Sequence, residues 1–156
     1  MAIAKRIPVE HSTVFPKGAF LHGEVTPVGD YNAPAGPDGQ RPQQRDKDTD
    51  LLLWQCVVID GDEDAGRRDI GVTVKFAAKY QPVPPENTSP LPWTPVEFVG
   101  LTALAYVDDN GNRPRIAWSY RADDLVAPGQ SSTTQSDQGT TRATKADVKP
   151  GVKDAA

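Results

Sequence analysis

The stretch IGVTVKF, residues 70–76, decides the fold class because apolar side chains alternate along it with small or polar ones. Successive side chains of a β-strand point to opposite faces of the sheet. Thr73 and Lys75 are therefore expected on the outer face, and the residues at even positions on the inner face: Ile70, Val72, Val74 and Phe76. A second strand, 51–60, precedes this one across the acidic loop 61–69, and the two are expected to pair antiparallel.

Further strands are expected on both sides of this pair. A strand over 19–28 precedes it, and strands over 96–107 and 113–122 follow it. The last two flank Asn110-Gly111, a dipeptide typical of tight β-hairpins. A short additional strand is expected over 40–45.

Five or six strands without a long helix favour an all-β domain over residues 1–126. A small antiparallel barrel, OB-like with Greek-key connections, is the preferred fold class, and a two-sheet β-sandwich is the alternative. Residues 127–156 are polar and contain no aromatic side chain. Such a segment buries too little apolar surface to offset its conformational entropy, so a disordered tail is expected there.

Composition narrows the class of protein. The chain has 156 residues, a hydrophobic fraction of 37% and a net charge of −4, so indiscriminate tight binding to a polyanion is not expected. Its only cysteine, Cys56, excludes an intramolecular disulfide and favours a reducing compartment. The N-terminus has no signal-peptide pattern, and no apolar stretch is long enough for a membrane helix. A soluble cytoplasmic protein without membrane partners is expected.

No residue pattern for catalysis, metal binding or cofactor binding stands out. His11 and His22 are the only histidines, and neither belongs to a zinc-protease motif. The acidic run 60–64 lacks the glycine and glutamate that an EF-hand requires, so it is interpreted as an acidic hairpin loop and not a calcium site. Cys56 is interpreted as a buried apolar residue. The protein is therefore expected not to be an enzyme and to need no cofactor or metal.

The segment from Gln81 to Pro95 contains six prolines, which favour an extended, semi-rigid loop. Tyr80 and Trp93 lie beside or within this loop. They are expected to cover the open end of the barrel, with stacking on a base or on a partner protein as the alternative.

A basic and polar outer face is the best candidate binding site. Alternation is expected to turn these residues inward: Trp54, Cys56, Val58, Ile116, Trp118 and Tyr120. OB-type domains guide a phosphate backbone with lysines and arginines and stack bases on nearby aromatic rings. An ordinary solvated face, protected by its charges from edge pairing, is the alternative. The residues predicted to bind nucleic acid are Gln55, Thr73, Lys75, Arg113, Arg115, Ser119 and Arg121.

Several short motifs occur in a recognisable order: GEVTPV (23–28), QRDKDT (44–49), LWQ (53–55), VTVK (72–75), QPV (81–83), PVEF (95–98) with GLT (100–102), and SYRA (119–122). In this order and spacing, which covers about residues 7–126, the chain resembles a family of small actinobacterial proteins. They are activators of plasmid replication, integration and excision, encoded by integrative conjugative elements.

The resemblance implies a role in switching a mobile element from its integrated state to excision and replication, most simply by raising expression of the genes for these steps. It implies no catalytic or DNA-contacting residue. The chain departs from the family pattern at Asp50, where a glycine usually closes the turn, and at Cys56, where a valine is common.

Two functions are expected from these observations. The first is a regulatory protein of a mobile element that binds DNA, with single-stranded DNA crossing the outer face. The second is a protein-interaction module that binds a replication or recombination protein without touching DNA. An enzyme is the least favoured class.

Overall fold

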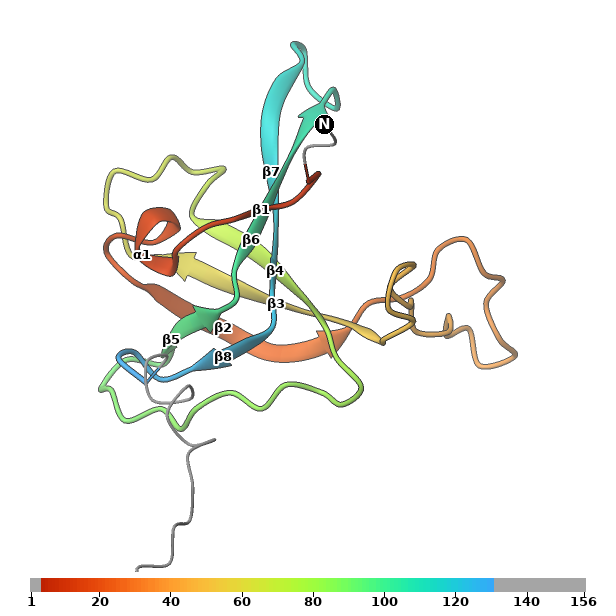
Figure 1. Ribbon diagram of the computed structural model, residues 1–156, viewed down its shortest axis with the longest axis horizontal. Coiled ribbons are helices and arrows are strands. Elements are labelled where there is room, and N and C mark those ends of the chain that lie inside the picture. Colours follow the sequence, from red (N-terminus) through yellow and green to blue (C-terminus); the bar gives the residue numbers. More distant parts are fainter. Residues whose placement is uncertain (1–3, 131–156) are drawn as a thin grey trace, which may run out of the picture.

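One curled β-sheet forms the body of the protein. A computed structural model describes residues 4–130, so most of the predicted tail lies outside the described part. The sheet has eight strands in the order β1-β6-β7-β4-β3-β2-β5-β8 (Figure 1), which confirms the all-β, barrel-like fold class. Its elements are β1 (Ile7–Pro8), α1 (His11–Val14), β2 (Ala19–Pro27), β3 (Leu53–Asp60), β4 (Gly71–Ala77), β5 (Thr94–Val99), β6 (Thr102–Asp108), β7 (Arg115–Ala122) and β8 (Asp124–Val126).

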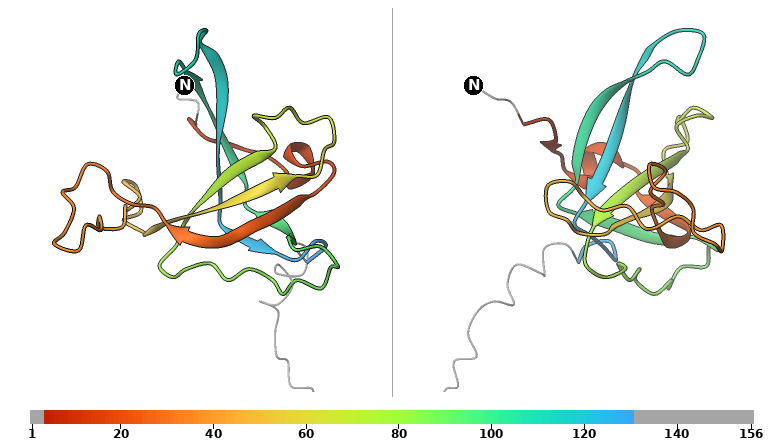
Figure 2. Two further views of the ribbon diagram at one scale, coloured as in Figure 1. Left: turned by 180° about the vertical axis from the view of Figure 1, so that it is seen from behind. Right: turned by 90° about the vertical axis from the view of Figure 1, so that its right-hand side faces the viewer.

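The pairing order makes the sheet curl into a half-barrel. β2, β3 and β4 form an antiparallel meander, and β4 pairs with β7 in parallel. β5 and β6 are separated only by Gly100 and Leu101, yet β5 pairs with β2 while β6 pairs with β7. The bent segment β5–β6 therefore joins the part of the sheet that contains β2 to the part that contains β7, as the views in Figure 2 show. With β5–β6 and β7–β8 each taken as one bent strand, the order is the Greek key of an OB-type barrel.

The bend between β5 and β6 depends on glycine. Gly100 has a φ of 64°, in the left-handed region that glycine adopts without steric cost. The Asp123 carboxylate occupies the space into which a Cβ would project. The Asp123 N–H donates to the Val99 carbonyl at 2.8 Å. The bend between β7 and β8 therefore lies next to the bend between β5 and β6.

The inner faces of the strands form the core. Val58, Val74 and Phe76 are fully buried, and Cys56 is buried as expected. Aromatic rings pack against one another at its centre, with centroids of Phe76 and Phe98 6.0 Å apart. Alternation therefore assigned the inner faces of β3 and of the second half of β4 correctly.

Several strand predictions were wrong in part. The predicted single strand 96–107 is divided into β5 and β6 at Gly100 and Leu101. Residues 40–45 form no strand: they make only the isolated bridges Gly29↔Gln43 and Arg45↔Leu52. Residues 28–30 and 51–53 lie beside the segment, with bonds such as those from the Gln44 N–H to the Val28 carbonyl and from the Leu53 N–H to the Gln44 carbonyl. Pro42 lacks an N–H, however, and the pairing stays limited to single bridges. β4 starts after Ile70, which is 41% exposed, and β7 starts after Pro114, which cannot donate to the ladder.

The β6–β7 hairpin extends past the barrel (Figure 1). Ile116 is 72% exposed and Trp118 is 48% exposed, so the prediction that both are core residues was wrong. They do share the face of Tyr120, which packs against the core. The first half of β7 simply has no barrel interior to face.

Tyr80 does not cover the barrel end, because its side chain is 74% exposed and the Lys79 ammonium lies 5.4 Å from its ring centroid. The proline-rich loop is instead attached to the barrel by Gln81, whose Nε2 donates to the Val25 carbonyl at 2.7 Å. Trp93 is less exposed, at 37%, and its predicted covering of the barrel end stays a prediction.

Candidate nucleic-acid interface

A groove opens where β4 and β7 separate. The two strands pair only over residues 74–76 and 120–122, and toward their N-terminal ends they diverge. The resulting groove has a volume of about 810 Å³ and lies between the start of β4, the β6–β7 hairpin and the end of α1. Because no strand pairing closes the sheet here, side chains from both of its faces line the groove. We call this the β4–β7 groove.

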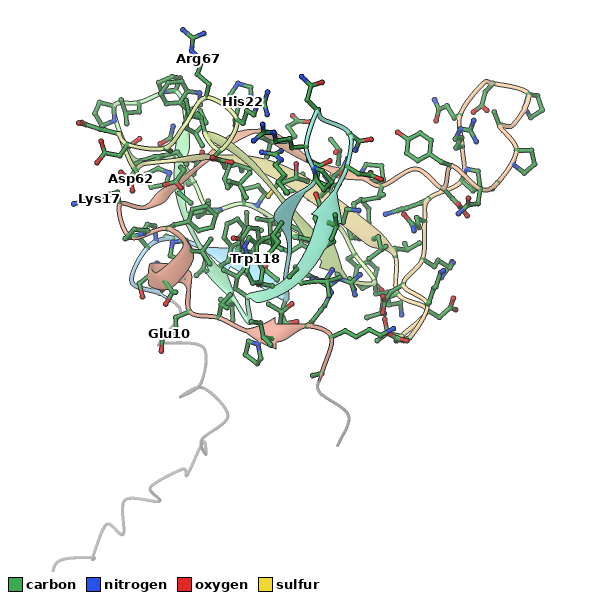
Figure 3. The ribbon with its side chains drawn as sticks, turned by 90° about the horizontal axis from the view of Figure 1, so that it is seen from above. Glu10, Lys17, His22, Asp62, Arg67 and Trp118 are labelled. Carbon is green, nitrogen blue, oxygen red and sulfur yellow. The ribbon has the colours of Figure 1, made fainter. Side chains whose placement is uncertain are left out.

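Exposed aromatic and apolar side chains border the β4–β7 groove. Trp118 is 48% exposed, and Tyr106 is 49% exposed. The β6–β7 register sets Trp118 opposite Ala105 and Tyr106 opposite Ala117, so the two rings lie on opposite faces of the hairpin. Figure 3 shows Trp118 near the centre of the molecule when it is viewed from above. Its ring is available as a stacking surface.

Three cations border the β4–β7 groove: Lys75 from β4, Arg68 from the β3–β4 loop and Arg115 from β7. Arg115 is partly neutralised, because its Nη2 lies 3.0 Å from Asp108 Oδ2. Lys75 and Arg68 make no ion pair within residues 4–130. Asp60 and Asp69 also border the groove, so its local charge is mixed.

The structure brings most of the predicted binding residues together. Thr73, Lys75, Arg115 and Ser119 all line the β4–β7 groove. Gln55 and Arg121 lie in one row with Lys75, since the registers pair Gln55 with Lys75 and Lys75 with Arg121. Arg113 is separate: it lies in the hairpin loop and lines a different hollow.

Arg121 is held by an internal partner. Its Nη1 lies 2.9 Å from Asp46 Oδ1, and the Asp46 side chain is only 8% exposed. Arg6 lies nearby and donates to the carbonyl and the hydroxyl of Ser119, at 3.3 Å each. Burial, and then the charge of Arg121, lower the pKa of the Arg6 guanidinium. Arg121 and Ser119 thus stabilise the fold, which leaves Lys75 as the open cation of the predicted row.

The Asp46 carboxylate also organises its own turn. Its Oδ2 accepts from the Thr49 N–H at 3.1 Å and from the Thr49 hydroxyl at 2.8 Å. These bonds, with the Arg121 pair, hold the pKa of Asp46 below its usual value. Asp50 closes the turn with a φ of 59°, the left-handed conformation in which glycine is usual.

His11 connects α1 to β5. Its Nδ1 accepts a hydrogen bond from the Phe98 N–H at 3.2 Å, and its ring packs against Phe15 and Phe98. Burial lowers the pKa of His11, although the neighbouring Glu97 acts in the opposite direction. The folded protein therefore favours the neutral imidazole, since a protonated Nδ1 cannot accept this bond.

We expect stability to fall as the pH drops from about 7.5 to about 5.5. The unfolded chain takes up a proton at the ordinary histidine pKa, whereas the folded protein resists it, so acid favours unfolding. Urea titrations at the two pH values measure the difference. His11→Gln should remove most of it, while His22→Gln, at an exposed position in β2, should keep it. Equal pH dependence in both variants would contradict this role of His11.

The described residues contain no metal-ligating cluster, and their one cysteine is not activated. No group of three or more His, Cys, Asp or Glu side chains within residues 4–130 could hold a metal ion. Burial raises the pKa of the Cys56 thiol to about 12, so the thiolate is not populated near neutral pH. Among the same residues no helix is long and apolar enough to cross a membrane.

Sequence reasoning missed the aromatic residues of the β4–β7 groove. Period-two alternation assigned Trp118 to the core because it cannot tell where a strand leaves the barrel. Tyr106 was not singled out, although its alternation with Ala105 and Val107 places it on the outer face. The signal that could have found both is their closeness to the Asn110-Gly111 turn, because residues near a hairpin tip project beyond the sheet.

Comparison of the chain with protein-family models, curated proteins and solved structures found no match.

Proposed function

We propose that the protein is a non-enzymatic accessory factor that binds single-stranded nucleic acid in the β4–β7 groove. The observation that carries this proposal is the position of Trp118, half-exposed in the groove, with Lys75 and Arg68 at its border. A base can stack on the indole while the cations contact phosphates. Tyr106 supplies a second ring on the other side of the hairpin.

Charge favours a single strand over a duplex. Duplex binding needs many cations spread along the surface, and this chain has a net charge of −4. Aspartates beside the groove would further repel the closely spaced phosphates of a duplex. A single strand needs fewer phosphate contacts because stacking of unpaired bases contributes about 1–3 kcal/mol per base.

The resemblance to activators of integrative elements supplies the biological setting. In this proposal the protein acts on the single-stranded DNA exposed when the element excises or starts to replicate. It would thereby assist the replication or recombination proteins working there. The same groove residues would then be needed for excision in the cell and for binding in solution.

Tryptophan fluorescence tests the groove directly. We expect an oligonucleotide to quench the emission of the wild-type protein, and Trp118→Ala to weaken binding about tenfold or more, because a stacking surface is lost. Trp93→Phe is the matched control: it removes an indole in the proline-rich loop and should leave affinity and quenching unchanged. Fluorescence anisotropy of a labelled oligonucleotide gives the affinity without relying on either tryptophan.

Salt dependence completes the test. Binding should weaken as salt rises, and Lys75→Ala should reduce the slope of this dependence because one phosphate contact is removed. Absence of binding at low salt, or equal affinity of the Trp118→Ala and wild-type proteins, would rule out this site.

A protein-interaction role is the second candidate, and the proline-rich loop favours it. Three apolar side chains in or beside it are well exposed: Tyr80 at 74%, Val83 at 80% and Leu91 at 44%. Such residues on an extended loop suit a partner with an apolar groove. Co-purification of a replication or recombination protein that survives nuclease treatment, and that Val83→Ser abolishes, would support this role.

A further inference from the structure

The outer edge of β6 is unpaired over most of its length. β1 pairs with β6 only through Ile7↔Ala103 and Pro8↔Thr102, whereas β6 continues to Asp108. On its other side β6 pairs with β7 along the whole strand. Among residues 4–130, no other strand pairs with residues 104–108. This edge contains no lysine or proline, the residues that usually protect a strand edge from pairing.

The direction of the free backbone groups follows from the existing pairing. The Val9 N–H donates to the Leu101 carbonyl at 3.0 Å, which is the hydrogen bond next to Ile7↔Ala103. In an antiparallel ladder alternate residues direct both N–H and C=O to the same side. Ala105 and Val107 therefore direct their backbone groups to the open edge, while those of Tyr106 point toward β7.

We propose that a second copy of this chain pairs with this edge, so that the β6 strands of two copies run antiparallel about a two-fold axis at Tyr106. Ala105 of each copy then lies opposite Val107 of the other. Both residues direct N–H and C=O to the edge, so the two pairs can form their full set of hydrogen bonds. Centring the axis on Ala105 would place Val107 opposite Ala103, whose edge β1 already occupies. The free edge thus permits one favourable register.

The side chains suit this register. Tyr106 would lie directly across from Tyr106 of the second copy, in a pair without backbone hydrogen bonds, where cross-strand side chains approach most closely. On the other face, Val107, which is 67% exposed, would pack beside the small Ala105 of the second copy. Pairing would therefore bury apolar surface on both faces of the hairpin.

Charge at the ends of the pairing also fits a second copy. Asp108 of one copy would lie opposite Leu104 of the other, just where β1 leaves the edge. Lys5 precedes β1 there and would lie near this aspartate, which Arg115 of its own copy already neutralises in part. The two-fold axis repeats the contact at the other end. Lys75 and Arg68 lie across β7 from this edge and would stay open, whereas Tyr106, which also borders the β4–β7 groove, would be covered by its symmetry mate.

Sedimentation velocity over a range of protein concentrations tests the assembly. We expect a concentration-dependent dimer for the wild type. Val107→Pro should be monomeric with an unchanged circular dichroism spectrum, because it removes an N–H that faces the open edge and not one that pairs with β7. Val107→Thr, which keeps the N–H and the β-branched shape, is the control and should still dimerise.

Cysteine cross-linking tests the register. Cα atoms of a pair without hydrogen bonds lie about 4.5 Å apart, within the range that a disulfide spans. Tyr106→Cys should therefore form a disulfide-linked dimer under mild oxidation, whereas Val107→Cys, offset by two residues from its symmetry mate, should not. Native Cys56 is buried and serves as an internal control in both variants. A monomeric wild type, a dimeric Val107→Pro variant, or cross-linking of Val107→Cys but not Tyr106→Cys would overturn the proposal.

Discussion

Gly61→Ala is expected to lower the free energy of unfolding by about 3 kcal/mol or more, since overpacking costs about 1–3 kcal/mol even where side chains can move. Gly61 directly follows β3, where the chain crosses the segment before β2, and its N–H donates to the Gly18 carbonyl at 2.9 Å. An added Cβ would overlap the Lys17 carbonyl oxygen and lie 3.0 Å from a ring carbon of Phe20. A backbone oxygen cannot rotate away as a flexible side chain can, so the strands themselves would have to shift.

Urea denaturation followed by circular dichroism measures this loss. Gly111→Ala is the matched control, because its Cβ would meet nothing closer than the Arg113 carbonyl at 3.9 Å. We expect its unfolding midpoint to stay near that of the wild type. A Gly61→Ala protein as stable as Gly111→Ala would show that the crossing is not tight.

Asp46→Ala is expected to destabilise the protein by about 2–4 kcal/mol, which is the range for breaking a buried, hydrogen-bonded charge pair. The substitution leaves Arg121 without its carboxylate, and Arg121 Nε is already buried without a partner among the described residues. It also removes the two bonds from Thr49 that close the turn. Denaturation of the variant beside Asp48→Ala, an exposed neighbour in the same turn, separates this effect from a general change of charge.

Two further measurements identify the ion pair as the cause. The double variant Asp46→Ala with Arg121→Met should be more stable than Asp46→Ala alone, because no charge is then left uncompensated. Asp46 has a lowered pKa, so its contribution is present above about pH 4 and is lost as the pH falls through the folded pKa. Asp46→Asn should therefore lose less stability than the wild type between pH 5 and pH 3. Additive single effects would argue against a coupled pair.

Much of the barrel could be predicted from the sequence, because the signals that define it are local. Alternation along residues 71–76 depends only on side-chain direction. The Asn110-Gly111 signal placed the β6–β7 hairpin correctly, although its loop spans residues 109–114 and neither residue has a positive φ. Errors arose where the signal depends on distant residues. The assignment of 40–45 as a strand failed because the tertiary fold limits the pairing of this segment with residues 28–30 and 51–53 to isolated bridges.

The candidate site was predicted only in part for a related reason. Alternation assigned Lys75 and Thr73 to the outer face correctly, since both lie within the barrel wall. It could not show that Arg121 is engaged by Asp46, 75 positions earlier in the chain. Nor could it show that β7 separates from β4 before Tyr120, which exposes Trp118.

The bend at Gly100 also has a consequence for how fast the chain folds. The β6–β7 hairpin joins neighbouring segments and can form within microseconds. Closure of the barrel instead requires β5 to find β2, whose paired residues Ala19 and Val96 are 77 positions apart. Because β5 continues into β6 through Gly100, the early hairpin must move together with β5 as β5 reaches β2, and it then takes its own place beside β4. The search for that one long-range contact, and not the making of any strand, is then the step that sets the folding time.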